Sequence, residues 1–202
     1  IWDERINSFY VQNNYPNQDL NAELERVEGG FGVTPQQHFN GLRNLLPHLK
    51  GLAILDNDGR NRMSNTDGPL KVSYWKRYET ENYFVTPEVL RSFARDHYAD
   101  FDLFGGFSTE IDAALDQLIM ERLFDGVQAD FDAWKQAAPE LARVLWEAKT
   151  ERQKLSTFAE EFFRSLAQKV GGQMLLKKGE LHSLVAHVPA QSLVPEVHEK
   201  LD

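Results

Sequence analysis

The sequence predicts an α/β core in the first half of the chain, followed by a helical region. Three observations predict this fold class. The run GLAIL at 51–55 is apolar without alternation, which is typical of a strand in a parallel sheet. A strand pattern at 23–32 and a helical pattern at 34–49 precede this run, and this order of strand, helix and strand implies a right-handed crossover unit. From residue 86 onward, apolar residues recur at helical spacing. We therefore expect an α/β core at 1–104 and a helical region at 105–202.

The first half contains four strand patterns and one helix pattern. SFYVQNN at 8–14 and ELERVEGGFG at 23–32 predict short strands. The helix is expected at 34–49, where a Thr-Pro pair opens a segment that has five apolar residues on one side. The next strand is GLAILDND at 51–58, which we expect to be covered on both faces. LKVSYWKRY at 70–78 predicts the last strand of the core.

The second half is helical by its spacing of apolar residues. The stripe formed by Phe158, Phe162, Phe163 and Leu166 is typical of a buried helix face. A proline at 139 interrupts one long helical pattern. The expected helices cover 86–99, 108–124, 129–155 with this interruption, 156–170 and 178–188.

Composition limits the classes of function. The chain has 202 residues, a formal net charge of −9 and no cysteine. The acidic charge argues against a free-standing DNA-binding protein, because it repels phosphates at long range. Without thiolates, a metal must be held by carboxylates, amides or histidines. We find no membrane-span pattern or signal-peptide pattern and expect a soluble, cytoplasmic protein.

Two aspartates follow the apolar strand directly. Asp56 and Asp58 stand two residues apart, and the carboxyl ends of strands are where ligands collect in open α/β sheets. Both carboxylates can turn toward one hard cation such as Mg²⁺, which prefers oxygen ligands. The alternative is a solvated turn, since Asn-Asp-Gly is common turn chemistry. As a Ca²⁺ loop the segment fails, because Arg60 falls at a ligand position.

A second acidic pair follows the next strand. Glu79 and Glu81 lie in YWKRYETENYF, with Lys76 and Arg77 beside them. Two successive strand ends that carry paired acids would converge on one volume. The alternative is an ordinary surface strand with alternating charges. The many aromatic residues of this segment favour a packed, functional location.

Together the two segments resemble a known family. LAILDND followed by WKRYETENYFVTPEVL is similar to the Toprim-like domain at the C-terminus of ATPases of the overcoming-lysogenization-defect type and related AAA/ABC-type ATPases. The late segment LLKKGELHSLVAHV also resembles the closing segment of that family. The resemblance spans about residues 24 to 202.

The resemblance implies a metal-dependent nuclease that acts on DNA, of the kind used in phage defence or DNA processing. Asp56 and Asp58 would bind Mg²⁺ or Mn²⁺, and Glu81 with Glu79 would complete a second metal site. Glu81 would also be catalytic. Lys178, or Lys177, would neutralise charge on the phosphate. Bound cations would reverse the local field, which explains how an acidic chain could meet DNA.

The family also has a glutamate at the end of its first strand, within V-E-G. Glu28 stands in such a triplet, but only 27 residues separate it from Asp56, which leaves room for one helix. The family pattern then places its glutamate before Ile1, and we expect a core that lacks its first strand. We also expect an N-terminal ATPase domain outside this chain, since it contains no G-x-x-x-x-G-K-[ST] motif.

Three other interpretations stay open. The domain could be a catalytically inactive regulatory or interaction module of an ATPase, because function depends on the site rather than the fold. LDNDGR also resembles the start of haloacid-dehalogenase-type phosphatases, although Arg60 stands at their threonine position. The charged run at 146–154 is most simply a solvated helix face, and the alternative is a dimerising helix in a homodimer.

Overall fold

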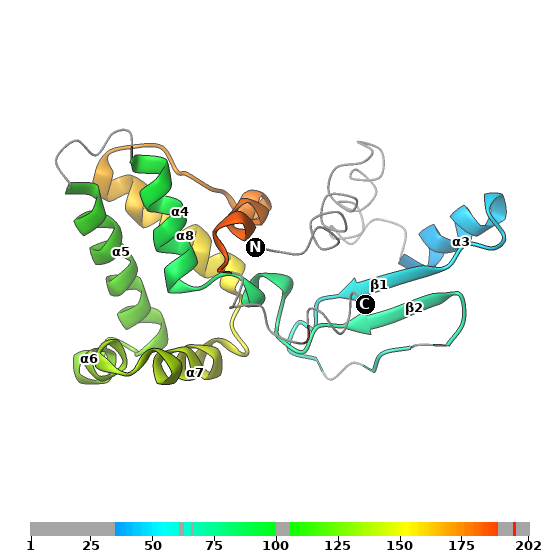
Figure 1. Ribbon diagram of the computed structural model, residues 1–202, viewed down its shortest axis with the longest axis horizontal. Coiled ribbons are helices and arrows are strands. Elements are labelled where there is room, and N and C mark those ends of the chain that lie inside the picture. Colours follow the sequence, from blue (N-terminus) through cyan, green and yellow to red (C-terminus); the bar gives the residue numbers. More distant parts are fainter. Residues whose placement is uncertain (1–34, 61–62, 66, 100–105, 190–195, 197–202) are drawn as a thin grey trace. The chain divides into compact units, whose positions relative to one another are not determined.

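The computed structural model (Figure 1) describes residues 35–60, 63–65, 67–99, 106–189 and 196. The chain divides into two compact units with a boundary between Lys76 and Arg77. The strand unit contains the described residues up to Lys76 together with Glu196, and the helical unit contains those from Arg77 to 189. The predicted strands at 8–14 and 23–32, with Glu28, lie outside the described residues.

The strand unit is built from one helix and two parallel strands. Helix α3 (Pro35–Leu45) precedes β1 (Gly51–Leu55), and β2 (Leu70–Tyr74) pairs with β1 in parallel (Figure 1). Gly51 lies opposite Leu70, and Leu55 opposite Tyr74, so both strands end at the same edge. The predicted α/β class and the predicted parallel pairing are confirmed for this part of the chain.

Helix α3 packs against the start of β1 through Phe39. Phe39 is buried, and a Cβ atom on Gly51 would lie 2.8 Å from its ring carbon Cε2. The strand therefore needs a residue without a side chain at this position. The helix ends at Leu45, four residues before the predicted end, because Pro47 cannot continue it. Arg43 donates to the carbonyl of Pro47.

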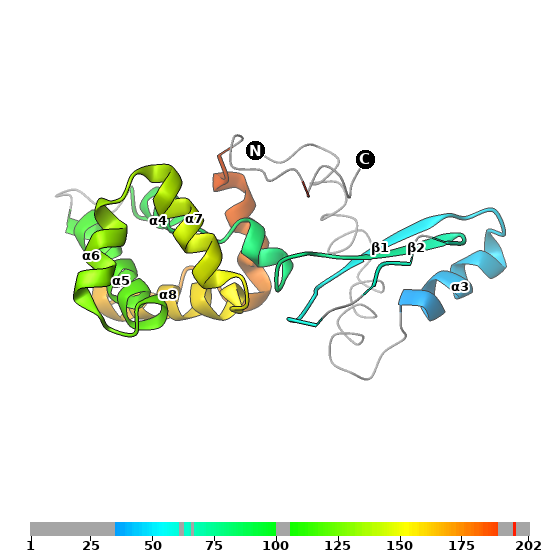
Figure 2. The same cartoon turned by 90° about the horizontal axis from the view of Figure 1, so that it is seen from below.

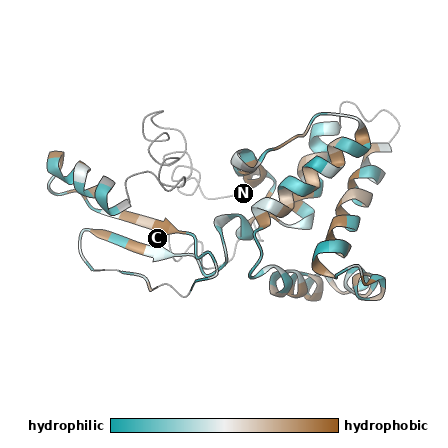
Figure 3. Cartoon of the chain, turned by 180° about the vertical axis from the view of Figure 1, so that it is seen from behind, coloured by the Kyte–Doolittle hydropathy of each residue, from teal (hydrophilic) through white to brown (hydrophobic). Residues whose placement is uncertain are grey.

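The connection from β1 to β2 returns along the second strand. Asn65 and Val72 exchange two backbone hydrogen bonds of 2.8 and 2.7 Å in an antiparallel bridge. Figure 3 shows the hydrophobic colouring of β1. However, Leu52 remains 39% exposed, so the predicted cover on both faces of this strand is not present at that residue.

The helical unit contains five α-helices and two 3₁₀ helices among the described residues. The predicted helices of the second half are present, and only the last differs in type, because it is a 3₁₀ helix. Helix α5 packs against both α4 and α8 (Figures 1 and 2). The elements are η1 (Thr80–Tyr83), α4 (Pro87–Tyr98), α5 (Gly106–Leu123), α6 (Gln128–Gln136), α7 (Pro139–Thr150), α8 (Leu155–Val170) and η2 (Lys178–His187).

Local signals explain where several of these helices begin and end. Thr86 caps α4, since its hydroxyl accepts a hydrogen bond from the amide of Val89 at 3.3 Å. Pro139 takes the first position of α7 and separates it from α6, as predicted. Gly171 ends α8 with a left-handed φ of 66°.

The core of the helical unit is apolar and aromatic. The predicted stripe of α8 is buried, and the ring centroids of Phe163 and of Phe93 from α4 lie 5.6 Å apart in an edge-to-face arrangement. A second aromatic row joins α6, α7 and α8 through Trp134, Trp146 and Phe158. Within the described residues, no helix has the length and apolar character needed to cross a membrane.

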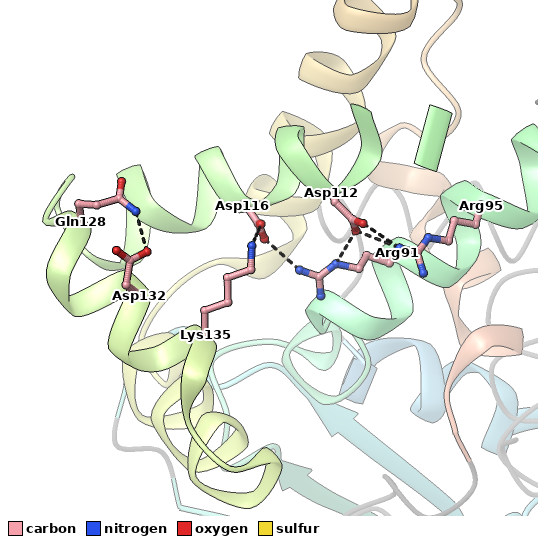
Figure 4. A network of polar contacts seen from close by, with 7 residues as sticks. All are labelled: Arg91, Arg95, Asp112, Asp116, Gln128, Asp132 and Lys135. Atoms are coloured by element: carbon pink, nitrogen blue, oxygen red, sulfur yellow. Dashed lines mark hydrogen bonds and ion pairs between the residues drawn. The ribbon is translucent and has the colours of Figure 1, made fainter. Parts of the chain in front are cut away.

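The helical unit begins earlier than the predicted boundary at residue 105. Its first helix, α4, buries Leu90 and Phe93 and packs on α5. A polar network reinforces this contact (Figure 4): Arg91 and Arg95 both pair with Asp112, and Asp116 pairs with Arg91 and Lys135. The predicted boundary between residues 104 and 105 lies outside the described residues.

Candidate functional site

The turn after β1 carries the first acidic pair. Asp56 is half-buried, while Asp58 is exposed. Asp58 has a φ of 51° and Gly59 a φ of 67°, both in the left-handed region. The amide of Arg60 closes the turn by donating to the carbonyl of Asn57 at 2.9 Å. Aspartate is one of the few residues with a side chain that tolerate this conformation.

The side chain of Asn57 links this turn by a hydrogen bond to the chain segment that follows β2. Its Nδ2 donates to the carbonyl of Lys76 at 3.2 Å, and the Lys76 amide donates to Oε1 of Glu196 at 2.9 Å. The other side-chain atom, Oδ1, is buried and has no hydrogen-bond partner among the described residues. A buried acceptor without a donor is costly, unless a ligand supplies the missing contact.

The side-chain oxygen atoms of this turn are of the type that binds a hard cation. Two carboxylates and the unpartnered amide oxygen of Asn57 are all oxygen ligands, the type that Mg²⁺ and Mn²⁺ prefer. The described residues contain no group of three or more His, Asp or Glu side chains placed to hold a metal. A complete site would therefore need amide oxygens, water or carboxylates from another segment.

The second acidic pair lies in the helical unit, and there Glu79 binds the start of α8. Its side chain is buried, with 4% of the residue exposed. Oε1 accepts from the Ser156 amide at 2.5 Å, and Oε2 accepts from the Ser156 hydroxyl at 3.1 Å. Lys154 Nζ lies 3.9 Å from Oε2. This carboxylate thus satisfies an amide at the N-terminus of a helix, where negative charge is favourable.

Asn82 binds the end of α7 in a corresponding way. Its residue exposure is 3%, and Nδ2 donates to the carbonyls of Thr150 and Gln153 at 2.9 and 3.1 Å. The Thr150 carbonyl lies at the C-terminus of α7, where helix carbonyls lack partners within the helix, and Gln153 lies in the turn that follows. Arg77 in turn donates to the carbonyl of Asn82 at 2.5 Å and pairs with Glu147 at 3.2 Å.

Glu81 stands between these two anchoring residues. It is half-buried within η1, and its backbone carbonyl accepts from the amides of Phe84 and Val85 at 3.1 and 2.8 Å. The chain on either side of Glu81 is thus fixed to the turn between α7 and α8. Its neighbours Glu79 and Asn82 are the two residues that make those contacts.

The predicted lysines lie at the start of η2. Lys178 is the first residue of this 3₁₀ helix, and Lys177 precedes it. The amide of Lys177 donates to Oε2 of Glu180 at 3.0 Å, and the Glu180 amide donates back to the Lys177 carbonyl at 2.9 Å. This reciprocal pair fixes the backbone at the start of the 3₁₀ helix.

The predicted site residues fall into both units. Asp56 and Asp58 belong to the strand unit, whereas Glu79, Glu81 and Lys178 belong to the helical unit. The prediction that the two pairs share cations stays a prediction.

Two further polar groupings in the helical unit were not predicted. A depression of about 320 Å³ is lined by Arg77, Asn82, Glu147 and Glu151, among others. Separately, the hydroxyl of Ser92 and Oδ2 of Asp96 each lie 3.3 Å from Nδ1 of His187. A nucleophilic relay needs the two partners on opposite ring nitrogens, so this group does not form a catalytic triad.

Sequence reasoning did not assign Asn82 or Ser156 to the site region. The E-N pair of ETENY was visible in the sequence, but Glu79 and Ser156 are 77 positions apart. Only the fold brings them together. We compared the chain with protein-family models, curated proteins and solved structures, and none of the three comparisons found a match.

Proposed function

We propose that the chain is the C-terminal Toprim-like module of an ATPase, and that it contributes to a Mg²⁺-dependent nuclease acting on DNA phosphodiesters. One observation carries the proposal: Asp56 and Asp58 follow a strand that is paired in parallel with its neighbour. Ligands collect at the carboxyl ends of parallel strands.

The local chemistry of the turn supports a cation there. Asp58 holds a left-handed conformation, and backbone strain of this kind clusters at functional sites. The amide oxygen of Asn57, the residue between the two aspartates in the sequence, lacks a hydrogen-bond partner among the described residues and could serve as a third oxygen ligand. Bound Mg²⁺ would supply Lewis acidity toward a phosphodiester. Asp56 and Asp58 would hold the metal, and the family resemblance adds Glu81 as a further ligand and Lys178 as the residue that offsets phosphate charge.

A second candidate function is a regulatory or interaction module without catalysis. It is favoured by Glu79, since both of its carboxylate oxygens are engaged by Ser156 within the helical unit. A carboxylate that caps a helix is accounted for by a structural role. On this hypothesis the segment at 79–82, called the ETEN segment here, stabilises the helical unit. The chain then binds no divalent cation with specific affinity.

Titration of the chain with Mn²⁺, followed by electron paramagnetic resonance of the free ion, separates the two functions. The nuclease proposal predicts saturable binding that Asp56→Ala abolishes. Asp67→Ala is the matched control, because Asp67 is an exposed aspartate in the same β1–β2 connection. Binding that is equal in both variants, or absent from the wild-type chain, would contradict the metal site.

Substrate assays separate the nuclease from a phosphatase of the haloacid-dehalogenase type. The proposal predicts nicking of supercoiled plasmid by the natural protein with Mg²⁺ and no turnover of an aryl phosphate. Turnover of the aryl phosphate, lost in Asp56→Asn, would favour the phosphatase instead. The aspartate would then act as a nucleophile, which an amide cannot replace.

A further inference from the structure

We infer that one face of α7 is a docking surface for an amphipathic helix of a partner protein, and that this partner helix carries basic side chains beside its apolar ones. The surface consists of an exposed apolar stripe on α7, formed by Leu141, Val144 and Ala148, and of the depression that adjoins it. All of these residues lie in the helical unit. The inference does not depend on the metal site proposed above.

Helix α7 has apolar residues on two sides. Its buried side carries Trp146, which belongs to the aromatic row of the core. On the other side, Leu141 and Val144 remain 52% and 51% exposed. These two residues and the exposed Ala148 follow one another at spacings of three and four residues, which places them along one line of the helix surface. Single exposed apolar side chains are ordinary, but a group of them on one face that the core does not use marks an interaction surface.

The depression of about 320 Å³ continues the stripe toward the C-terminus of α7. Val144 and Ala148 form part of its lining, together with Glu147 and Glu151. Asn82 also lines it, and Oδ1 of this nearly completely buried side chain has no hydrogen-bond partner among the described residues. A buried acceptor without a donor is costly, so a partner's donor that reaches this oxygen would remove the cost. The depression therefore suits a long side chain with an aliphatic stem and a charged donor, such as arginine or lysine.

The charges along the stripe favour a basic partner. Glu147 is already neutralised within the chain, because Arg77 and Arg143 both pair with it, at 3.2 and 2.9 Å. Glu140 and Glu151 are exposed, and neither forms an ion pair with another described residue. These two glutamates stand at the two ends of the stripe, so a partner helix with a basic side chain near each end would complement both of them.

A second copy of the chain fits this surface less well. In an antiparallel pair of α7 helices centred on the stripe, Glu140 of one copy would lie near Glu151 of the other. In a parallel pair, each glutamate would lie beside its own counterpart. Like charges at close range oppose association in both arrangements. The observations thus favour a partner of complementary charge over a homodimer through α7.

The test measures binding of a labelled model peptide to the full chain by fluorescence anisotropy. The peptide has about 18 residues, enough to form a helix, with leucine at every third or fourth position and arginine on the flanks of this stripe. We expect saturable binding. Two further peptides should each bind at least about tenfold more weakly, one with glutamate in place of each arginine and one with the same composition but no apolar stripe.

Two variants of the chain separate the apolar and the charged contributions. Val144→Gln removes an apolar side chain from the stripe without changing the net charge, and it should weaken binding by about tenfold. Glu151→Arg reverses the charge beside the depression and should also weaken binding by about tenfold. Glu88→Arg is the matched control, because it makes the same change of charge at an exposed position of α4. Its affinity should stay within about twofold of the wild type. All three positions are exposed, and circular dichroism checks that each variant is folded.

Several outcomes would overturn the inference. Absence of saturable binding by the arginine peptide, or equal binding of the arginine and glutamate peptides, would contradict the basic partner. Equal losses in Glu151→Arg and Glu88→Arg would show only a general effect of net charge, and unchanged affinity in Val144→Gln would exclude docking on the stripe. Sedimentation velocity tests the competing occupant: the wild type and Val144→Gln should sediment alike, whereas a wild-type dimer that Val144→Gln dissociates would assign the stripe to a second copy.

Discussion

Asp58 adopts a backbone conformation that most residues avoid. Its φ of 51° places it in the left-handed region, next to Gly59 in the same region. Left-handed backbone costs about 1–2 kcal/mol for an ordinary residue and less for Asn or Asp. Aspartate therefore suits this position both because it tolerates the left-handed backbone and because it carries a negative charge. Substitutions can separate the effects of backbone conformation and of charge on stability.

We predict that Asp58→Asn leaves the free energy of unfolding nearly unchanged, since asparagine also tolerates the left-handed region. Asp58→Val should lower it by about 1–2 kcal/mol, because a β-branched side chain clashes with the backbone there. Chemical denaturation with urea measures both values. Equal stability of the asparagine and valine variants would show that the turn is not held in this conformation.

Tyr98 buries a hydroxyl without a hydrogen bond among the described residues. Burial raises the pKa of this phenol above its ordinary value of 10.0. Because the folded pKa is raised, the native state disfavours ionised Tyr98. Its contribution to stability is therefore complete below the unfolded pKa and is lost as the pH rises through the folded pKa.

Tyr98→Phe should stabilise the helical unit by about 1 kcal/mol at pH 7, because it removes an unpaired buried polar group. It should also reduce the loss of stability above about pH 10. Thermal unfolding followed by circular dichroism between pH 7 and 11 measures both effects. A destabilised phenylalanine variant with an unchanged pH profile would contradict this account of the hydroxyl.

At the scale of elements, the contact between α3 and β1 depends on Gly51. A Cβ atom there would lie 2.8 and 3.0 Å from two ring carbons of Phe39 and 3.1 Å from Cδ1 of Leu70. These contacts are shorter than packed atoms normally make, so a larger residue would force the helix away from the strand.

Gly51→Ala should therefore cost about 1–3 kcal/mol in free energy of unfolding, the usual penalty for an overpacked core. The double variant Phe39→Leu/Gly51→Ala should recover part of that loss, since the smaller side chain leaves room for the methyl group. A double-mutant cycle in urea measures the coupling. Strictly additive losses would show that Phe39 does not restrict this position.

The ETEN segment joins the end of α7 to the start of α8. Glu79→Ala should lower the free energy of unfolding by about 2–3 kcal/mol, because it leaves the buried Ser156 amide and hydroxyl without their acceptor. Urea denaturation of the full chain measures this loss. Glu88→Ala serves as the control, as an exposed glutamate of α4, and a loss no larger than that of the control would contradict the capping role.

Much of the element structure could be predicted because its signals are local. The Thr-Pro start of α4, the interruption at Pro139 and the apolar spacing of α8 each depend on neighbouring residues. The type of the last helix was missed, because a short 3₁₀ helix and an α-helix share similar patterns. The end of α3 was placed too late, although Pro47 was visible.

The candidate site was less predictable, since it depends on residues distant in sequence. Asp56 and Asp58 were found from a strand pattern and are placed at a strand end, as expected. The Glu79–Ser156 contact was missed, because a carboxylate that caps a helix and one that binds metal look the same in sequence. The burial of the carboxylate and its hydrogen-bond partners distinguish the two roles, and both of these properties follow only from the fold.

At the scale of the whole molecule, the described chain forms two compact units that meet in sequence at Arg77. We predict that the fragment Arg77–Ser192 folds by itself, because its helices share one apolar core. Far-ultraviolet circular dichroism should show a helical spectrum and a cooperative thermal transition. A fragment that unfolds without cooperativity would show that this unit depends on the remainder of the chain.

The central claim is that Asp56 and Asp58 hold a divalent cation at the end of β1, and Mn²⁺ affinity in a double-mutant cycle tests it most directly. Asp56→Asn and Asp58→Asn should each weaken binding, and the double variant should lose less than the sum of the two single losses in free energy, because both residues serve one site. Wild-type affinity in Asp58→Asn, together with weakened binding in Asp56→Asn, would contradict the shared site.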